Sequence, residues 1–249
     1  MRAARVLPLL ALAGCLDYEQ QVVLYPDGSG KIVRRLAVKR DARNLLRALS
    51  KEKAAPSDPV AEFADLSRLK EDSRGIAAWA PVERASKDGW DSATVTAYFE
   101  DVNQVRLHLL QPSDGVLERR LEFAARYAKS ASGGSLEIDP SGRDALNPDD
   151  PHFKAALPFL KDARVRFSVR APGPVERAEG FPEKEGRDAS FLFDQARIQA
   201  ALKDPKGDAS RELDRLLDER PRVTWASVAL PEEEQAAFRR EFEEARKGR

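Results

Sequence analysis

Alternating apolar and polar residues run through most of this chain and predict an antiparallel β-sheet. In the stretch 93–99, Ala, Val, Ala and Phe alternate with Thr, Thr and Tyr, the pattern of a sheet with one solvated face. The same two-residue period predicts strands at 18–25, 31–38, 76–82, 105–109, 117–127, 165–169, 189–193 and 223–227. Turn sequences at 26–30 (Pro-Asp-Gly-Ser-Gly) and 87–89 (Lys-Asp-Gly) connect neighbouring strands. We therefore expect about eight or nine strands, joined largely by short turns.

Apolar residues at helical spacing predict helices between and after these strands. Such segments begin near 41, 58, 150, 194, 208 and 231. The last is the best defined, because Pro231 is followed by three glutamates that complement the helix dipole, and Phe238, Phe242 and Ala245 form an apolar stripe. The expected fold class is α+β, an antiparallel sheet with inserted helices and a C-terminal amphipathic helix.

The domain organisation follows from the polar stretches. Residues 130–150 form the longest run rich in Gly, Ser, Pro and Asp, and we expect a flexible loop there. We expect residues 15–249 to form a single composite domain around that loop.

The first fifteen residues have the pattern of an export signal. Arg2 and Arg5 form a positive segment, residues 6–13 are mostly apolar, and Gly14 precedes Cys15, the one cysteine of the chain. The apolar run is far shorter than the ~20 residues that span a bilayer, so we interpret 1–14 as a signal peptide to be removed. An ordinary secretory signal that happens to contain a cysteine, or a buried N-terminal strand, is the alternative.

The segment Leu12-Ala13-Gly14-Cys15 resembles the bacterial lipobox. The resemblance implies cleavage between Gly14 and Cys15, thioether lipidation of Cys15, and acylation of its new N-terminus by chains such as palmitate. Several chains together give stable membrane anchoring, whereas one gives only reversible binding. Leu16, rather than Asp, follows the cysteine. By resemblance to lipoprotein sorting in Gram-negative bacteria, this favours the outer membrane, facing the periplasm, over the inner membrane.

Composition and motifs limit the classes of partner, cofactor and activity that the chain can have. Forty-two basic residues balance 42 acidic ones, so no strongly basic surface is expected and nucleic acid is an unsuited partner. His108 and His152 are the only histidines and stand in no metal-binding pattern, so we expect no metal and no cofactor. No GxSxG or phosphate-loop motif occurs, and we expect no enzymatic activity. The acidic residues Asp139, Asp144, Asp149 and Asp150 lack the spacing of a calcium-binding EF-hand.

Arg164, Arg166 and Arg170 alternate along one predicted strand and therefore share one face. They are candidates for contact with anionic lipid headgroups or a polyanionic envelope polymer. The alternative is a solvated face on which acidic neighbours balance the arginines.

Two segments resemble the LppM-like lipoproteins of bacterial envelopes. One is the lipobox cysteine followed by a strand, the Asp-Gly-Ser-Gly turn at 27–30 and a second strand. The other is Val165-Arg166-Phe167-Ser168-Val169 running into Pro172-Gly173 and a further strand. The resemblance implies an envelope lipoprotein and brings no catalytic residues with it.

Two interpretations of function remain open. The first is a membrane-anchored, non-enzymatic envelope lipoprotein that binds a protein, polymer or lipid partner or has a structural role. The alternative is a lipid-binding or lipid-transfer protein with an apolar cavity under the sheet, lined by the apolar positions of 93–99 and 117–127. A carboxylate hydrolase acting on cell-wall or polysaccharide material has only the abundance of Asp and Glu in its favour.

Overall fold

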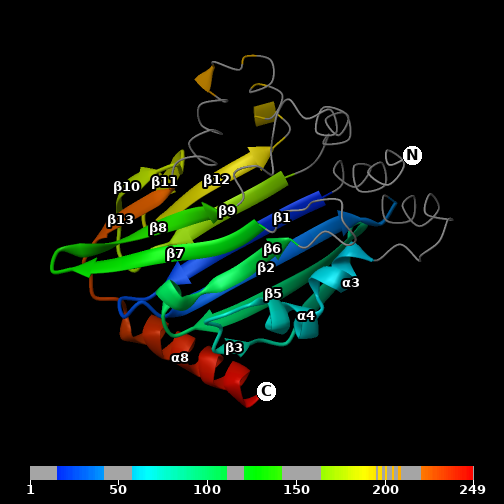
Figure 1. Ribbon diagram of the computed structural model, residues 1–249, viewed down its shortest axis with the longest axis horizontal. Coiled ribbons are helices and arrows are strands. Elements are labelled where there is room, and N and C mark those ends of the chain that lie inside the picture. The colour runs from blue at the N-terminus through cyan, green and yellow to red at the C-terminus, as the bar shows by residue number, and fades with distance from the viewer. Residues whose placement is uncertain are drawn as a thin grey trace.

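A computed structural model describes residues 16–41, 58–110, 121–141, 164–194 and 220–248, together with a few single positions between 196 and 208. This described part forms thirteen strands in two sheets and three α-helices (Figure 1). The α+β class with a C-terminal helix is therefore confirmed. Cys15, the signal segment and the acidic positions from 144 to 150 lie outside the described residues, as does His152.

Eight strands form sheet A. In their spatial order they are β11 (Glu183–Glu185), β12 (Asp188–Asp194), β9 (Arg164–Arg170), β1 (Leu16–Leu24), β2 (Gly30–Lys39), β5 (Trp90–Phe99) and β3 (Ala78–Trp79), with β4 (Glu83–Lys87) also on β5. All neighbours are antiparallel except β1 and β9, which run parallel with Asp17 beside Arg164. Sheet A is thus mixed where the sequence predicted a purely antiparallel one.

Five strands form sheet B, in the order β10 (Val175–Glu179), β13 (Arg222–Ala226), β8 (Gly133–Ser141), β7 (Leu121–Ser130) and β6 (Arg106–Leu110). Strand β8 occupies part of the segment predicted as a loop at 130–150. The described residues form more strands than the expected eight or nine because β8 was not predicted and because β4, β10 and β11 are edge strands. Their side chains are mostly exposed on both faces, so they lack the alternation that reveals a strand.

Two short helices cover one end of sheet A. Helix α3 (Pro59–Phe63) begins as predicted, because the Asp58 carboxylate accepts hydrogen bonds from the backbone N–H of Val60 and Ala61 and Pro59 occupies the first turn. Helix α4 (Leu66–Asp72) is capped in the same way by Asp65. A 3₁₀ turn (Val102–Gln104) follows β5.

The even-numbered residues of β1 and β2 point to one side of sheet A, its inner face. At one end, Val22, Leu24 and Ile32 pack with Leu136 and Trp225 of sheet B. At the other end, where β1 begins, the inner face is covered by α3. Figure 1 shows this division, with sheet B over one part of sheet A and α3 and α4 over the other.

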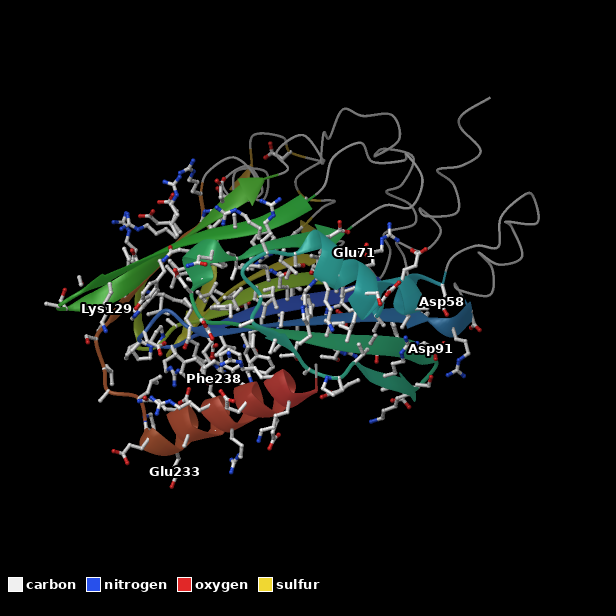
Figure 2. All side chains as sticks on the ribbon, turned by 60° about the horizontal axis from the view of Figure 1, so that its bottom comes forward. Asp58, Glu71, Asp91, Lys129, Glu233 and Phe238 are labelled. Carbon is white, nitrogen blue, oxygen red and sulfur yellow. The ribbon has the colours of Figure 1, made fainter. Side chains whose placement is uncertain are left out.

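The opposite, outer face carries the C-terminal helix α8 (Glu232–Lys247). Phe238, Phe242 and Ala245 are buried against Tyr25 and Tyr98, which confirms the predicted apolar stripe. Figure 2 shows Phe238 between the helix and the sheet, and Glu233 on the far side of the helix. Since α8 covers the end of sheet A distant from the start of β1, the outer face near that start is left for other contacts.

Candidate functional site

The start of β1 marks one end of sheet A, which we call the anchor end because Leu16 is the residue after Cys15. Leu16 pairs with Val38 of β2, and Val38 pairs in turn with Asp91 of β5. Figure 2 shows Asp91 near Asp58 at this end of the molecule and Lys129 at the opposite end. Any group attached to Cys15 is therefore held one residue away from a regular strand.

The three arginines of β9 lie on the outer face but do not form one patch. Arg164 is at the anchor end, between Asp17 of β1 and Asp194 of β12. Arg170 lies six residues further, about 20 Å along the strand, and its guanidinium donates two hydrogen bonds of 2.9 Å to the Asp188 carboxylate. These bonds raise the pKa of Arg170. Arg166 lies between Glu19 and Leu192.

Acidic neighbours thus accompany Arg164, Arg166 and Arg170 along β9. Contact of these arginines with an anionic ligand therefore stays a prediction, and so does the alternative of a solvated face on which acidic neighbours balance their charge. Another part of the same face is hollowed into a groove.

A groove of ≈ 290 Å³ lies on the anchor side of the outer face, over β2, β5 and β4, and we call it the β4–β5 groove. Its lining residues are Arg35, Glu83, Arg84, Ala85, Lys87, Trp90, Ser92 and Thr94. The strand register explains the hollow. One row across the strands holds Arg35, Thr94 and Glu83, another holds Lys39, Trp90 and Lys87, and the row between them holds the small residues Ala37, Ser92 and Ala85.

Cations predominate in the groove. Three cationic residues, Arg35, Arg84 and Lys87, and one acidic residue, Glu83, line it. Arg84 pairs with Ala93 of the inner face, so its side chain starts from the opposite face of β4 and reaches the groove only around this edge strand. Arg35 is partly balanced by Asp17, whose carboxylate lies 3.5 Å from its Nη1. Among the residues that the structure describes, Arg84 and Lys87 form no ion pair. Hydroxyl groups of Ser92 and Thr94 also line the groove, and that of Ser92 donates to the carbonyl of Ala85 at 3.4 Å. The groove therefore offers both charge and hydrogen-bonding groups to an anion.

The tip of the β4–β5 hairpin is fixed to the end of β2. The backbone N–H of Arg40 donates to the carbonyl of Gly89 at 2.8 Å, and its guanidinium lies 3.2 Å from the Asp91 carboxylate. The Ser86 hydroxyl donates to the same carboxylate at 2.6 Å. Lys39 places its ammonium 5.3 Å from the ring centre of Trp90. The groove therefore rests on a braced hairpin rather than on an isolated loop.

A polar cluster is buried behind the groove, on the inner face. The Arg34 side chain, 2% exposed, donates from Nε to the Tyr18 hydroxyl, which donates at 2.9 Å to Gln20. The Arg34 guanidinium also lies 5.1 Å from the ring centre of Phe63 in α3. Within the described residues, Nε2 of Gln20 has no hydrogen-bond partner. The cluster separates the two apolar parts of the inner face and ties α3 to it by a cation–π contact.

The titratable groups with clearly shifted pKa values lie mainly around α8. Burial, followed by the charges of Glu234 and Glu241, raises the pKa of Tyr25 to about 12. Burial, followed by Glu241, raises the pKa of Tyr98 to about 12. Hydrogen bonds from Arg187 lower the pKa of Glu234. These shifts accompany the packing of α8.

Only some of the other residues considered as site candidates lie in the described part of the structure. His108 lies in β6 and Asp139 in β8. In the part of the chain that the structure describes, no three His, Cys, Asp or Glu side chains gather as a metal site. No helix there is long and apolar enough to cross a membrane.

Sequence reasoning did not find the groove. The turn at 87–89 was predicted, and both Asp88 and Gly89 have the positive φ angles that such a turn needs. The alternation after Trp90 also showed which residues share a face. The missing information was the register with β2, which brings Arg35 beside Thr94. The small residues between two rows of long side chains were the available signal.

The described residues form an α+β protein of two packed sheets with a charged groove over β2, β5 and β4. No known family model matches the chain, and no curated protein matches it. Among solved structures, the chain is similar to the NMR structure of the folded domain of LppM from Mycobacterium tuberculosis. The two are 10% identical, with a TM-score of 0.36 over 86% of this chain and 91% of that one. So weak an overlap establishes neither a common fold nor a common role.

Proposed function

We propose that the chain is a lipid-anchored protein of the bacterial cell envelope, attached to the membrane through Cys15. The observation that carries the proposal is the position of this cysteine. It closes a lipobox-like segment and stands one residue before β1, the central strand of sheet A. With no linker between anchor and strand, the domain would stay at the membrane surface.

The proposed location is the outer membrane, facing the periplasm, with Leu16 after the cysteine as its support. We propose a non-enzymatic role in binding or structure. At the anchor end, charged side chains brace the strands: Arg35 pairs with Asp17 and Arg40 with Asp91. Such an arrangement suits a stable surface that a partner contacts.

The alternative of a lipid-holding cavity under the sheet receives less support. Ala93, Val95, Ala97 and Phe99, its proposed lining, are at most 1% exposed, and Ala93, Val95 and Phe99 belong to the packed apolar clusters. The β4–β5 groove lies on the opposite face of sheet A. Other proposed lining positions, from 117 to 120, lie outside the described residues.

Membrane fractionation of a Cys15→Ala variant tests the anchor. We expect the wild type in the detergent-extracted membrane fraction, and the variant either soluble in the envelope or as an uncleaved precursor of larger size. A Cys15→Ala protein that stays in the membrane fraction at the wild-type size would contradict the proposal. Ser29→Ala serves as a control, because Ser29 lies beyond β1 and has no part in the anchor.

A further inference from the structure

We infer that the β4–β5 groove binds the anionic phospholipid headgroups of the membrane in which Cys15 is anchored. This inference rests on the proposed anchor for its geometry and adds a second, electrostatic contact to it. Lipid anchors gain stability when an attached chain is combined with a basic patch.

The first support is distance. Leu16, Val38 and Asp91 lie side by side on three adjacent strands, so the residue after the anchor is two strand spacings, about 10 Å, from the start of β5. Attraction between a protein cation and an anionic membrane falls off over a Debye length, about 10 Å at 0.1 M salt. The anchor therefore holds the hairpin tip inside the range where this attraction acts.

The second support is the chemistry of the hollow. A phosphodiester headgroup needs cations and hydrogen-bond donors, and the groove supplies Lys87 and the Thr94 hydroxyl, with Arg84 at the edge of β4. Both cations belong to exposed β4, an edge strand that nothing covers among the described residues. Glu83 and Asp88 lie beside these cations, while Arg35, which pairs with Asp17, and Lys39 lie on β2.

The third support is Trp90, which stands at the hairpin tip with Lys39 against its ring. Tryptophan is enriched where a protein meets the headgroup layer, because its ring is apolar and its N–H can still be hydrated. Lys129, a cation of sheet B, lies at the far end of the molecule from Asp91 (Figure 2). Trp90 and Lys87 lie together at the anchor end.

Vesicle flotation tests the groove separately from the anchor. The protein is the mature chain, residues 15–249, with Cys15→Ser, so that no lipid is attached. We expect it to float with vesicles of phosphatidylcholine and phosphatidylglycerol, to stay behind with phosphatidylcholine alone, and to be released by added salt. The groove variant Arg84→Glu with Lys87→Glu should lose at least ~25-fold in partitioning, about fivefold for each cation near an anionic surface.

The matched control is Arg126→Glu with Lys129→Glu, which reverses two exposed cations of β7 and changes the net charge equally. We expect it to keep most of the binding. Equal losses in both variants, or no binding of the Cys15→Ser chain to anionic vesicles, would overturn the inference. If instead the wild-type chain isolated from membranes carries no lipid while the groove still binds, the anchor proposal fails and the groove inference stands.

Discussion

The ring of Tyr25, directly after β1, stacks on the ring of Phe238 in α8, with 4.0 Å between centroids and 21° between planes. Phe242 stacks in turn on Tyr98 of β5, at 5.6 Å and 9°. These two contacts join residues more than a hundred positions apart and fix the C-terminal helix to the outer face. Offset aromatic pairs of this kind add about 0.5–1.5 kcal/mol beyond the area they bury.

Replacing Phe238 with alanine should therefore lower the free energy of unfolding by about 3–5 kcal/mol, the usual cost of removing a buried phenylalanine. Chemical denaturation would measure the loss, and hydrogen exchange would show whether α8 detaches before the sheets unfold. Arg239→Ala is the control, because Arg239 is exposed on the same helix. Equal stability of the two variants would show that α8 adds little to the fold.

The raised pKa values of Tyr25 and Tyr98 predict alkaline behaviour. Their folded pKa of about 12 exceeds the ordinary value of 10.0, so the stability that they contribute is complete below pH 10 and is lost as the pH rises through 12. Absorbance of tyrosinate during an alkaline titration should show both ionising near pH 12. Glu241→Gln should lower the pKa of Tyr98, because it removes the charge of the carboxylate that accepts its hydrogen bond at 3.4 Å. Ionisation of both residues near pH 10 would contradict the packing described for α8.

Low pH should weaken the attachment of the N-terminal end of α8 to the rest of the protein. Arg187 donates two hydrogen bonds, of 2.8 and 2.9 Å, to Glu234 and lowers its pKa below the ordinary 4.5. The stability from this pair is present above pH 4.5 and is lost as the pH falls through the lowered folded pKa. In melting curves across this range, the advantage of the wild type over Glu234→Gln should shrink with falling pH. Glu233→Gln, on the solvent side of α8 (Figure 2), should follow the wild type, and a Glu234→Gln protein with unchanged acid sensitivity would rule out this role for the pair.

Gly30, in the turn between β1 and β2, should not tolerate substitution by a larger residue. Gly28 has a φ of +86°, as its turn position requires, but Gly30 is constrained by packing. A Cβ at Gly30 would lie 2.1 Å from the carbonyl oxygen of Val23 and 2.6 Å from the Phe99 ring. Gly30→Ala should therefore cost about 1–3 kcal/mol. Gly248→Ala, whose Cβ would meet nothing closer than 3.8 Å, should change the free energy of unfolding by less than about 0.5 kcal/mol, and a similar effect of both would refute the explanation.

Much of the fold could be predicted from local patterns. Residues 93–99 showed their buried face directly, and Phe238, Phe242 and Ala245 showed the buried face of α8. The parallel pairing of β1 with β9 could not be foreseen, because it joins residues about 150 positions apart and depends on no local turn. Strand β8 was hidden for a different reason. A Cβ at Gly134 would lie 2.7 Å from the Trp225 ring, so the small residue that indicated a loop instead makes room for β13.

Of the features proposed for function, only the anchor proposed at Cys15 could be predicted from the sequence. Cys15 is identified by sequence neighbours, which are visible without a structure. The groove depends on the register that sets Ser92 between Ala37 and Ala85, and on edge strand β4, whose side chains are exposed on both faces. Arg164 and Arg170 were assigned to one face correctly, but their distance along β9 and the pairing of Arg170 with Asp188 required coordinates.

The mass of the N-terminal peptide of the protein extracted from bacterial membranes tests the central claim most directly. The account predicts a chain that begins at Cys15 and carries a diacylglyceryl group on sulfur, with an acyl chain on the new amino terminus. An N-terminal peptide that retains Gly14, or that begins at Cys15 with a free thiol, would contradict it.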